Sequence, residues 1–312
     1  MSNGISIIIC CFNSAERITE TVKHLALQNT KEEINWEVII VDNASTDDTT
    51  SICLKLQHKF PQLIFKIVKE HKTGLTNARI RGVLEASYDM GIFCDDDNWL
   101  QENYLLTAYK LFDQNPKIGI IGAYGIPVFE TEQPPYFEYN QAPALAVGKQ
   151  AKHNGKIVSK TPSVYGAGMV FNLNLFVKLI IDSQYGFKTT DRIGNTLISG
   201  GDYEICEVFS QAGYEIHFSD ELQFKHYIPS RRTELKYYKK LFFGIGYSQF
   251  LIQGSKGWQD IIDLLRSVRN ICQSFITLFL KKHNKQYPYK YIHLFYTLYS
   301  SLGFIKSYLK KL

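Results

Sequence analysis

Four short apolar runs, separated by helix-like segments, dominate the first hundred residues of this 312-residue chain. The runs cover residues 6–13, 36–42, 63–68 and 92–95. Each run is too short for a helix, and its composition is typical of a strand buried on both faces. Strands that alternate with helices of about ten to fifteen residues indicate βαβ units around a parallel sheet. The sequence therefore predicts an α/β fold with a Rossmann-like, mostly parallel sheet flanked by helices.

Carboxylates follow two of these runs directly. Asp42 ends the second run, and the fourth run continues into Asp95, Asp96 and Asp97. Ligands of a parallel sheet bind beyond the carboxyl ends of its strands, so we expect these side chains to converge on one site. Adjacent carboxylates cannot all be buried unpaired, and a hard cation such as Mg²⁺ or Mn²⁺ would neutralise them. An acidic surface turn is the alternative explanation of the triplet.

The following residues predict a less regular part of the same domain. Residues 118–123 and 165–171 have the composition of strands, and residues 125–163 between them indicate a long loop. Asp202 stands in the first turn of an expected helix. His226 stands in the second of two short strands expected near residues 214–218 and 223–227.

The net charge of +5 conceals an uneven distribution along the chain. Residues 1–224 hold 19 Lys and Arg against 27 Asp and Glu, whereas residues 225–312 hold 16 against 3. We therefore expect a catalytic domain over residues 1–230 and a basic, aromatic-rich helical extension over residues 231–312. The extension would pack on the first domain or lie on an anionic membrane surface, and the pattern permits both.

The cysteine usage and the lack of a recognisable secretion signal predict a cytoplasmic protein, either free or on the inner face of the cytoplasmic membrane. The six cysteines include no CxxC pair, which is typical of reduced, buried thiols. The N-terminus lacks a basic segment followed by a cleavage site, and no run of eighteen apolar residues occurs.

Taken in order, six motifs of residues 4–230 resemble those of the family 2 glycosyltransferases, which have the GT-A fold. The motifs are Ser6–Asn13, Val41–Asp47, Gly74–Arg79, the DxD-like Asp95–Asp97, Gly166–Gly168 and Gly201–Glu204. One departure concerns the last motif, where Gly201 replaces the acidic residue that usually precedes the catalytic aspartate. The acceptor contacts of that missing carboxylate have no evident counterpart in the sequence.

The resemblance implies an inverting transfer of a sugar from a nucleotide-diphosphate sugar to an acceptor hydroxyl. It implies Asp202 as the general base, and a Mn²⁺ or Mg²⁺ site at Asp97 with help from Asp95 and His226. The donor is expected to be a UDP-sugar, with dTDP- and GDP-sugars as alternatives. The acceptor would be a saccharide or lipid-linked saccharide of surface polysaccharide, lipopolysaccharide or glycolipid synthesis. Residues expected around the nucleotide are Cys11, Phe12, Asn13, Glu16, Asp42, Asn43, Gly74, Arg79, Asp95 and Asp96.

Two other functions are compatible with part of the pattern. A nucleotidyltransferase would also be an α/β enzyme with carboxylates and a metal, but the Gly-rich basic loop expected after its first strand is absent here. A polyanion- or membrane-binding module with a degenerate nucleotide domain would use the basic extension alone. The joint presence of Asp42, Asp97 and Asp202 favours an enzyme, and we expect no nucleic-acid partner.

Overall fold

The computed structural model describes most of the chain and divides it into two compact units. The described residues are 2–30, 34–134, 137, 143–189, 191, 197–254, 258–280 and 292–311. The first unit comprises residues 1–128, 139–186 and 202–227, and the second comprises residues 129–138, 187–201 and 228–312.

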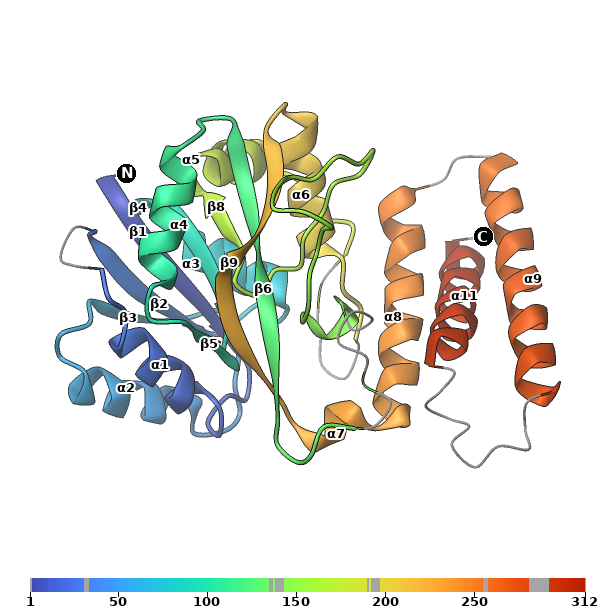
Figure 1. Cartoon of the computed structure of the whole chain (residues 1–312), viewed down its shortest axis with the longest axis horizontal. Helices are drawn as coiled ribbons and strands as arrows, with labels where there is room; N and C mark the ends of the chain where they lie inside the picture. The colour runs from blue at the N-terminus through green and yellow to red at the C-terminus, as the bar shows by residue number, and fades with distance from the viewer. Residues whose placement is uncertain are drawn as a thin grey trace. The chain divides into compact units, whose positions relative to one another are not determined.

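The N-terminal half of the sheet is parallel, as the sequence predicts. Its four strands are β1 (Ser2–Cys11), β2 (Trp36–Asp42), β3 (Phe65–Lys69) and β4 (Tyr88–Asp95). They lie in the order β3-β2-β1-β4 (Figure 1), so the first strand occupies a central position between the second and the fourth. The α/β prediction is confirmed.

The rest of the sheet is antiparallel, which makes the nine-stranded sheet of the described residues a mixed one. Next to β4 follow β8 (Val170–Asn172), β6 (Ile118–Phe129), β9 (Glu215–Ile228) and β5 (Asn98–Leu100), and β7 (Gly155–Lys156) also pairs with β9.

Several of these strands differ from the expected ones: β5 was not expected, β7 lies in the segment expected to be a loop, and β8 begins only at Val170. Strand β6 extends into the segment expected to be a loop, and the two short strands expected near His226 form one 14-residue strand. Pairing with β5, β6 and β7 along its length keeps β9 extended.

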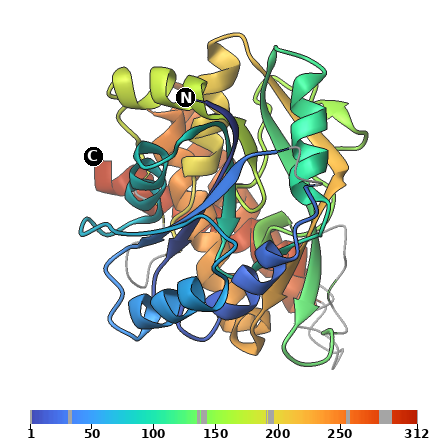
Figure 2. The ribbon, with the colours of Figure 1, turned by 90° about the vertical axis from the view of Figure 1, so that its left-hand side faces the viewer.

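Helices cover both faces of the parallel half of the sheet. On one face lie α1 (Ile18–Ala26), α2 (Thr49–Lys59) and α4 (Tyr104–Asp113), of which α1 and α2 are seen side by side in blue in Figure 2. On the other lie α3 (Leu75–Leu84), α5 (Leu173–Phe176) and a π-helical turn, η3 (Val177–Asp182). The unit also contains η2 (Pro143–Leu145) and most of α6 (Gly201–Gln211).

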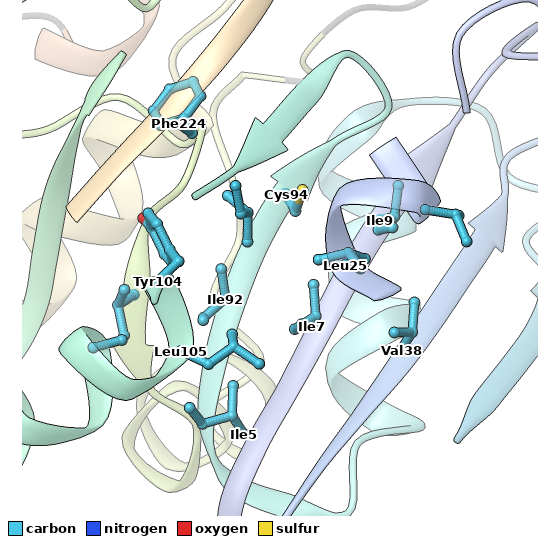
Figure 3. Packing of buried hydrophobic residues seen from close by; sticks show 14 of the residues in the cluster. Ile5, Ile7, Ile9, Leu25, Val38, Ile92, Cys94, Tyr104, Leu105 and Phe224 are labelled. Carbon is cyan, nitrogen blue, oxygen red and sulfur yellow. The ribbon is translucent and has the colours of Figure 1, made fainter. Parts of the chain in front are cut away.

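The core follows from the alternation of side chains along the central strand. Ile5, Ile7 and Ile9 point to the face that carries α1 and α4, where Leu25 and Leu105 pack against them (Figure 3). The intervening Ile8 points to the other face, where it contacts the backbone of α3 at Gly82. Helix α3 packs so close to β1 that a larger residue at this glycine would collide with Ile8.

The second unit is mainly helical, as expected for the C-terminal extension. Its helices are α7 (Ser230–Thr233), α8 (Leu235–Gln253), α9 (Trp258–Leu280) and α11 (Ile292–Lys311). Helix α11 packs against both α8 and α9. Gly246 of α8 and Gly303 of α11 bring the backbones of these two helices into contact. No helix in the described part of the chain has the length and apolar character needed to cross a membrane.

Candidate active site

The carboxyl ends of the parallel strands bring the predicted carboxylates to one edge of the sheet. Cys11 of β1 pairs in register with Asp42 of β2, and Cys10 pairs with Asp95 of β4. The two aspartates therefore flank the end of the central strand on either side. This arrangement is the one expected from the sequence.

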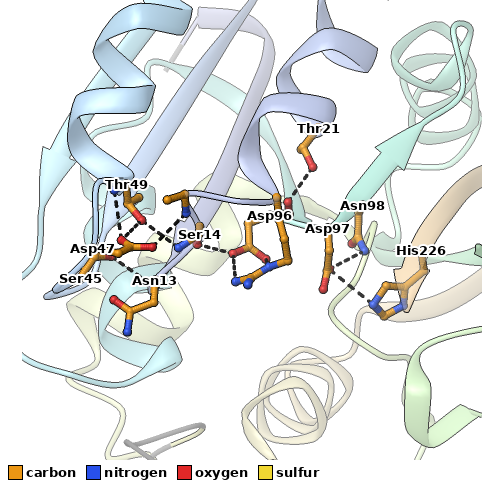
Figure 4. Close-up of polar contacts among 12 residues, drawn as sticks. Asn13, Ser14, Thr21, Ser45, Asp47, Thr49, Asp96, Asp97, Asn98 and His226 are labelled. Carbon is orange, nitrogen blue, oxygen red and sulfur yellow. Dashed lines mark hydrogen bonds and ion pairs between the residues drawn. The ribbon is translucent and has the colours of Figure 1, made fainter. Parts of the chain in front are cut away.

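A network of polar groups fixes the loops after β1 and β2 (Figure 4). Asn13 has a positive φ of 50°, a conformation that asparagine tolerates better than most residues. The side-chain oxygen of Asn13 accepts a 2.8 Å hydrogen bond from the backbone amide of Thr46, and the backbone amide of Asn13 donates to the Ser45 hydroxyl at 3.0 Å. Asp42 accepts hydrogen bonds from the Ser45 amide, at 3.0 Å, and from the Thr50 hydroxyl. The Asp42 carboxylate thus caps the turn that follows it, a structural role that is compatible with nucleotide binding.

Asn43 connects this network to the loop before α3. Its amide nitrogen donates to the carbonyls of Glu70 and Lys72, at 3.1 and 2.8 Å. Its side-chain oxygen accepts a 2.8 Å hydrogen bond from the Gly74 amide. The predicted nucleotide-site residues Asn13, Asp42, Asn43 and Gly74 are therefore held in one continuous hydrogen-bonded loop system.

The acidic triplet forms a tight turn between β4 and β5. The Asn98 side chain accepts from the Asp95 amide at 3.1 Å and donates to Asp97 at 3.3 Å, so it fixes both ends of the turn. Asn98 also pairs in register with His226 of β9. This pairing places the His226 ring nitrogen Nε2 3.4 Å from Oδ1 of Asp97 (Figure 4), and both side chains are buried. The structure thus brings together Asp97 and His226, two of the three predicted metal ligands.

Asp96 points to a different set of partners than its two neighbours. Its carboxylate forms an ion pair with Arg17, at 2.6 Å, and accepts a hydrogen bond from the Ser14 hydroxyl. Its backbone carbonyl accepts from Thr21 of α1 at 2.8 Å. Asp96 therefore ties the acidic turn to the start of α1, and its predicted contact with the nucleotide remains a prediction.

Burial and mutual repulsion change the titration of the triplet. Burial and the Asp97 carboxylate raise the pKa of Asp95 to about 6, while the nearby Arg79 and His226 side chains limit the rise. Burial and Asp97 also raise the pKa of Asp96, and its ion pair with Arg17 opposes this effect. The turn therefore concentrates negative charge that a cation would stabilise.

Arg79 and Asp202 form a second charged pair in the same unit. The buried Arg79 guanidinium stacks over the Phe93 ring, 4.8 Å from its centroid, and donates to Oδ1 of Asp202. The other carboxylate oxygen of Asp202 accepts a 2.7 Å hydrogen bond from the Gly166 amide. A side chain at position 166 would overlap both partners, so only glycine permits this approach. Because Arg79 lies against Phe93 of β4, two residues before Asp95, this ion pair holds Asp202 near the carboxyl end of that strand.

Three of the residues expected at the nucleotide lie at the margin of this site. The Cys11 side chain is buried in the hydrophobic core. Its backbone contacts the loops, where its carbonyl accepts a 2.8 Å hydrogen bond from the backbone amide of Asn43. Phe12 and Glu16 are exposed.

The donor set suits a hard divalent cation only in part. Asp95 and Asp97 offer the carboxylate oxygens that Mg²⁺ and Mn²⁺ prefer, whereas the imidazole nitrogen of His226 is a ligand more typical of Zn²⁺ or Fe²⁺. Within the described residues, however, no three His, Cys, Asp or Glu side chains are arranged as a ready-made metal site. Mg²⁺ is commonly bound by one or two protein carboxylates together with substrate phosphates. The turn fits that type of site, in which the diphosphate would complete the coordination.

Three residues that support the site were not expected from the sequence. Arg17 and Asn98 hold the acidic turn. Asp191 accepts hydrogen bonds from the backbone amides of Gly200 and Gly201, at 2.6 and 2.8 Å, where α6 begins. Asn98 directly follows the acidic triplet and was therefore recognisable as a neighbour. The roles of Arg17 and Asp191 depend on contacts that no local pattern indicates.

We expect the ion pair of Arg17 and Asp96 to contribute strongly to stability. Arg17→Met should lower the free energy of unfolding by about 2–4 kcal/mol, because it leaves the Asp96 carboxylate buried without its cation. The matched control is Arg81→Met, since Arg81 pairs with Glu85 at 2.7 Å on the more exposed surface of α3. The free energy of unfolding of this control should fall by less than about 1 kcal/mol. Urea titration measures the free energy of unfolding of both variants. Equal losses in the two variants would show that the acidic turn does not depend on Arg17.

Known proteins with similar sequences include two enzymes that act on sugars. The poly-beta-1,6-N-acetyl-D-glucosamine synthase of Staphylococcus aureus (strain COL) is 30% identical over 119 residues, which is 38% of this chain and 27% of that protein. The chain thus matches about a quarter of the length of this relative. The glucosyl-dolichyl phosphate glucuronosyltransferase of Haloferax volcanii is 20% identical over 251 residues, covering 78% of this chain and 76% of the relative.

Solved structures show the same fold. The mannosyltransferase PcManGT from Pyrobaculum calidifontis, in complex with GDP-Man and Mn2+, has a TM-score of 0.63 and 16% identity, covering 100% of this chain and 89% of the other. S. aureus TarS 1-349 has a TM-score of 0.52 and 19% identity, covering 78% and 65%. The model described as Glycosyl transferase family 2 matches residues 6–177, more than half of the chain. The chain therefore belongs to glycosyl transferase family 2.

Proposed function

We propose that this protein is an inverting glycosyltransferase that moves a sugar from a nucleotide-diphosphate donor to an acceptor hydroxyl. The observation that carries the proposal is the ion pair of Asp202 with Arg79, which lies against Phe93 of the strand that leads into the acidic turn. An inverting displacement needs a base on one side of the sugar and a stabilised leaving group on the other. Family membership favours glycosyl transfer over nucleotidyl transfer.

On the leaving-group side, Asp97, Asp95 and His226 would hold Mn²⁺ or Mg²⁺ together with the diphosphate. The metal would supply positive charge to the oxygens of the leaving nucleotide diphosphate. The loop system of Asn13, Asp42 and Asn43 would bind the nucleoside. Support for the last assignment comes from its position at the carboxyl ends of β1 and β2, where ligands of such sheets bind.

On the acceptor side, Asp202 would take the proton of the attacking hydroxyl. Arg79 and the Gly166 amide fix the orientation of this carboxylate before substrate binds, so little reorganisation is needed during the reaction. Because Gly201 stands where the family usually has an acidic residue, the acceptor side would have one carboxylate fewer. Asp191 binds the amide of Gly201 and so stabilises the backbone that leads into α6.

The chemical class of donor and acceptor is suggested by the relatives. TarS 1-349 was solved with UDP-GlcNAc, at a TM-score of 0.52 and 19% identity, and PcManGT with GDP-Man and Mn2+. We favour a UDP-sugar and keep GDP- and dTDP-sugars as alternatives. The names of the curated relatives include a polysaccharide synthase and a transferase for a dolichyl phosphate-linked sugar. These names support a saccharide or lipid-linked saccharide as the acceptor.

A thermal-shift screen tests the donor side of the proposal. UDP, GDP and dTDP are each added with Mn²⁺, with Mg²⁺ or with EDTA. At about 100 times its Kd, a nucleotide that binds only the folded protein stabilises it by about 2.7 kcal/mol, which raises Tm by several degrees. We expect this increase for one nucleotide and only in the presence of metal. If none of the nine mixtures raises Tm, the protein does not bind a nucleotide diphosphate in the way proposed.

A further inference from the structure

Helix α9 buries three of its polar residues and exposes several of its apolar residues. Asp260, Ser267 and Ser274, seven residues apart along the helix, are buried, and Ser274 is only 2% exposed. Leu265 and Ile276, in contrast, are 64% and 59% exposed. The surface helix of a water-soluble protein normally has the opposite distribution, with its apolar stripe toward the core. The exposed apolar side chains of α9 are therefore available to a partner other than the neighbouring helices.

The exposed side chains of α9 form one continuous row. Its members follow one another at intervals of three or four residues, which places them on the same side of the helix. They are Ile261, Leu265, Val268, Cys272 and Ile276. A row of this length exceeds the single exposed apolar residues found on most protein surfaces.

A second row runs beside the apolar one and carries positive charge. It contains Ile262, Arg266, Arg269 and Gln273, again at intervals of three or four residues, and these side chains are exposed. Arg266 also forms a 3.0 Å ion pair with Asp263. The apolar row and the basic row together have the arrangement of a helix that lies in a membrane interface. The apolar side chains of such a helix enter the lipid, and its basic residues stay at the level of the phosphates.

We propose that α9 docks the protein on the surface of an anionic lipid membrane. The charge of the surrounding chain selects this partner, because residues 225–312 hold 16 Lys and Arg against 3 Asp and Glu. Anionic lipids attract such a surface, whereas two copies of it would repel each other. Nucleic acid would satisfy the charge but not the apolar row, since its backbone offers phosphates and not hydrocarbon. The proposal does not depend on the transferase activity.

Vesicle co-sedimentation of the full chain tests this surface. The vesicles contain phosphatidylcholine alone or phosphatidylcholine with phosphatidylglycerol. We expect the unmodified protein to bind the anionic vesicles at least about tenfold more tightly than the neutral ones. The double variant Leu265→Gln/Ile276→Gln should bind the anionic vesicles at least about tenfold more weakly, because both side chains lose their contact with lipid.

The matched control replaces two exposed leucines of other helices. Leu54 of α2 and Leu84 of α3 are 46% and 60% exposed, so Leu54→Gln/Leu84→Gln removes comparable apolar surface away from α9. This control should bind the anionic vesicles as the unmodified protein does, and circular dichroism verifies that both double variants are folded.

Three results would overturn the proposal. One is the absence of binding of the unmodified protein to anionic vesicles. Another is equal binding by the α9 double variant. The third is a dimer of the unmodified protein in size-exclusion chromatography that the α9 variant abolishes, because a second copy would then be the partner of this surface.

Discussion

Asp202→Asn is expected to lower turnover by about 10²- to 10⁴-fold while leaving nucleotide binding nearly unchanged. Asparagine has the shape of aspartate, and its single side-chain oxygen can keep the hydrogen bond from Arg79 or the one from the Gly166 amide, but not both. It cannot take the proton of the acceptor hydroxyl, and general base catalysis typically contributes a factor of this size. The measurement compares initial transfer rates and, separately, nucleotide affinity by calorimetry.

Glu204→Gln is the matched control for this variant. Glu204 stands in the same first turn of α6, so its neutralisation removes the same charge from the N-terminus of the helix. Its carboxylate bonds to the Tyr185 hydroxyl at 3.3 Å rather than to Arg79. We expect the rate of this control to stay close to that of the unmodified enzyme. Retained transfer by Asp202→Asn, or an equal loss in both variants, would refute the role of Asp202 as the base.

Asp97→Ala is expected to weaken metal-dependent nucleotide binding by at least about 100-fold. Asp97 is buried next to His226 at the end of β4, where a carboxylate would hold the metal and through it the diphosphate. Changes in the outer shell of metal sites already cost about 10- to 100-fold, so the loss of a direct ligand should cost at least as much. Asp97→Asn, which keeps the hydrogen-bond geometry better, provides a second test with less risk to folding. Calorimetry with the nucleotide selected by the thermal-shift screen measures the effect, in Mn²⁺ and in EDTA.

Asp220→Asn serves as the control for this second prediction. Asp220 lies on β9, the strand that carries His226, but it bonds to Lys149 and Asn154 at 2.9 and 2.7 Å on the surface. Its replacement should leave the affinity unchanged both with and without metal. Unaltered affinity in the two Asp97 variants would show that this carboxylate does not hold the metal.

The local pattern of the sequence was sufficient for the parallel strands that lead into the site. The strands ending at Asp42 and Asp95 are recognisable from short buried runs, and both run parallel to β1 as predicted. The pattern failed at β9, which it divided into two strands. Residues between 218 and 223 have no strong strand propensity of their own, and they are extended because strands on both sides pair with β9. The family resemblance is confirmed, whereas the roles of individual site residues remain predictions.

The sequence by itself determined which groups reach the edge of the sheet, because the end of a strand fixes the position of the residue that follows it. Only the tertiary structure decided how those groups pair. Arg79 meets Asp202 across 123 positions of the chain, and Arg17 meets Asp96 across 79. Such contacts depend on the packing of distant elements, which local periodicity does not encode. The same holds for α9, whose apolar row is visible in the sequence, while its packing against α11 decides that this row faces outward.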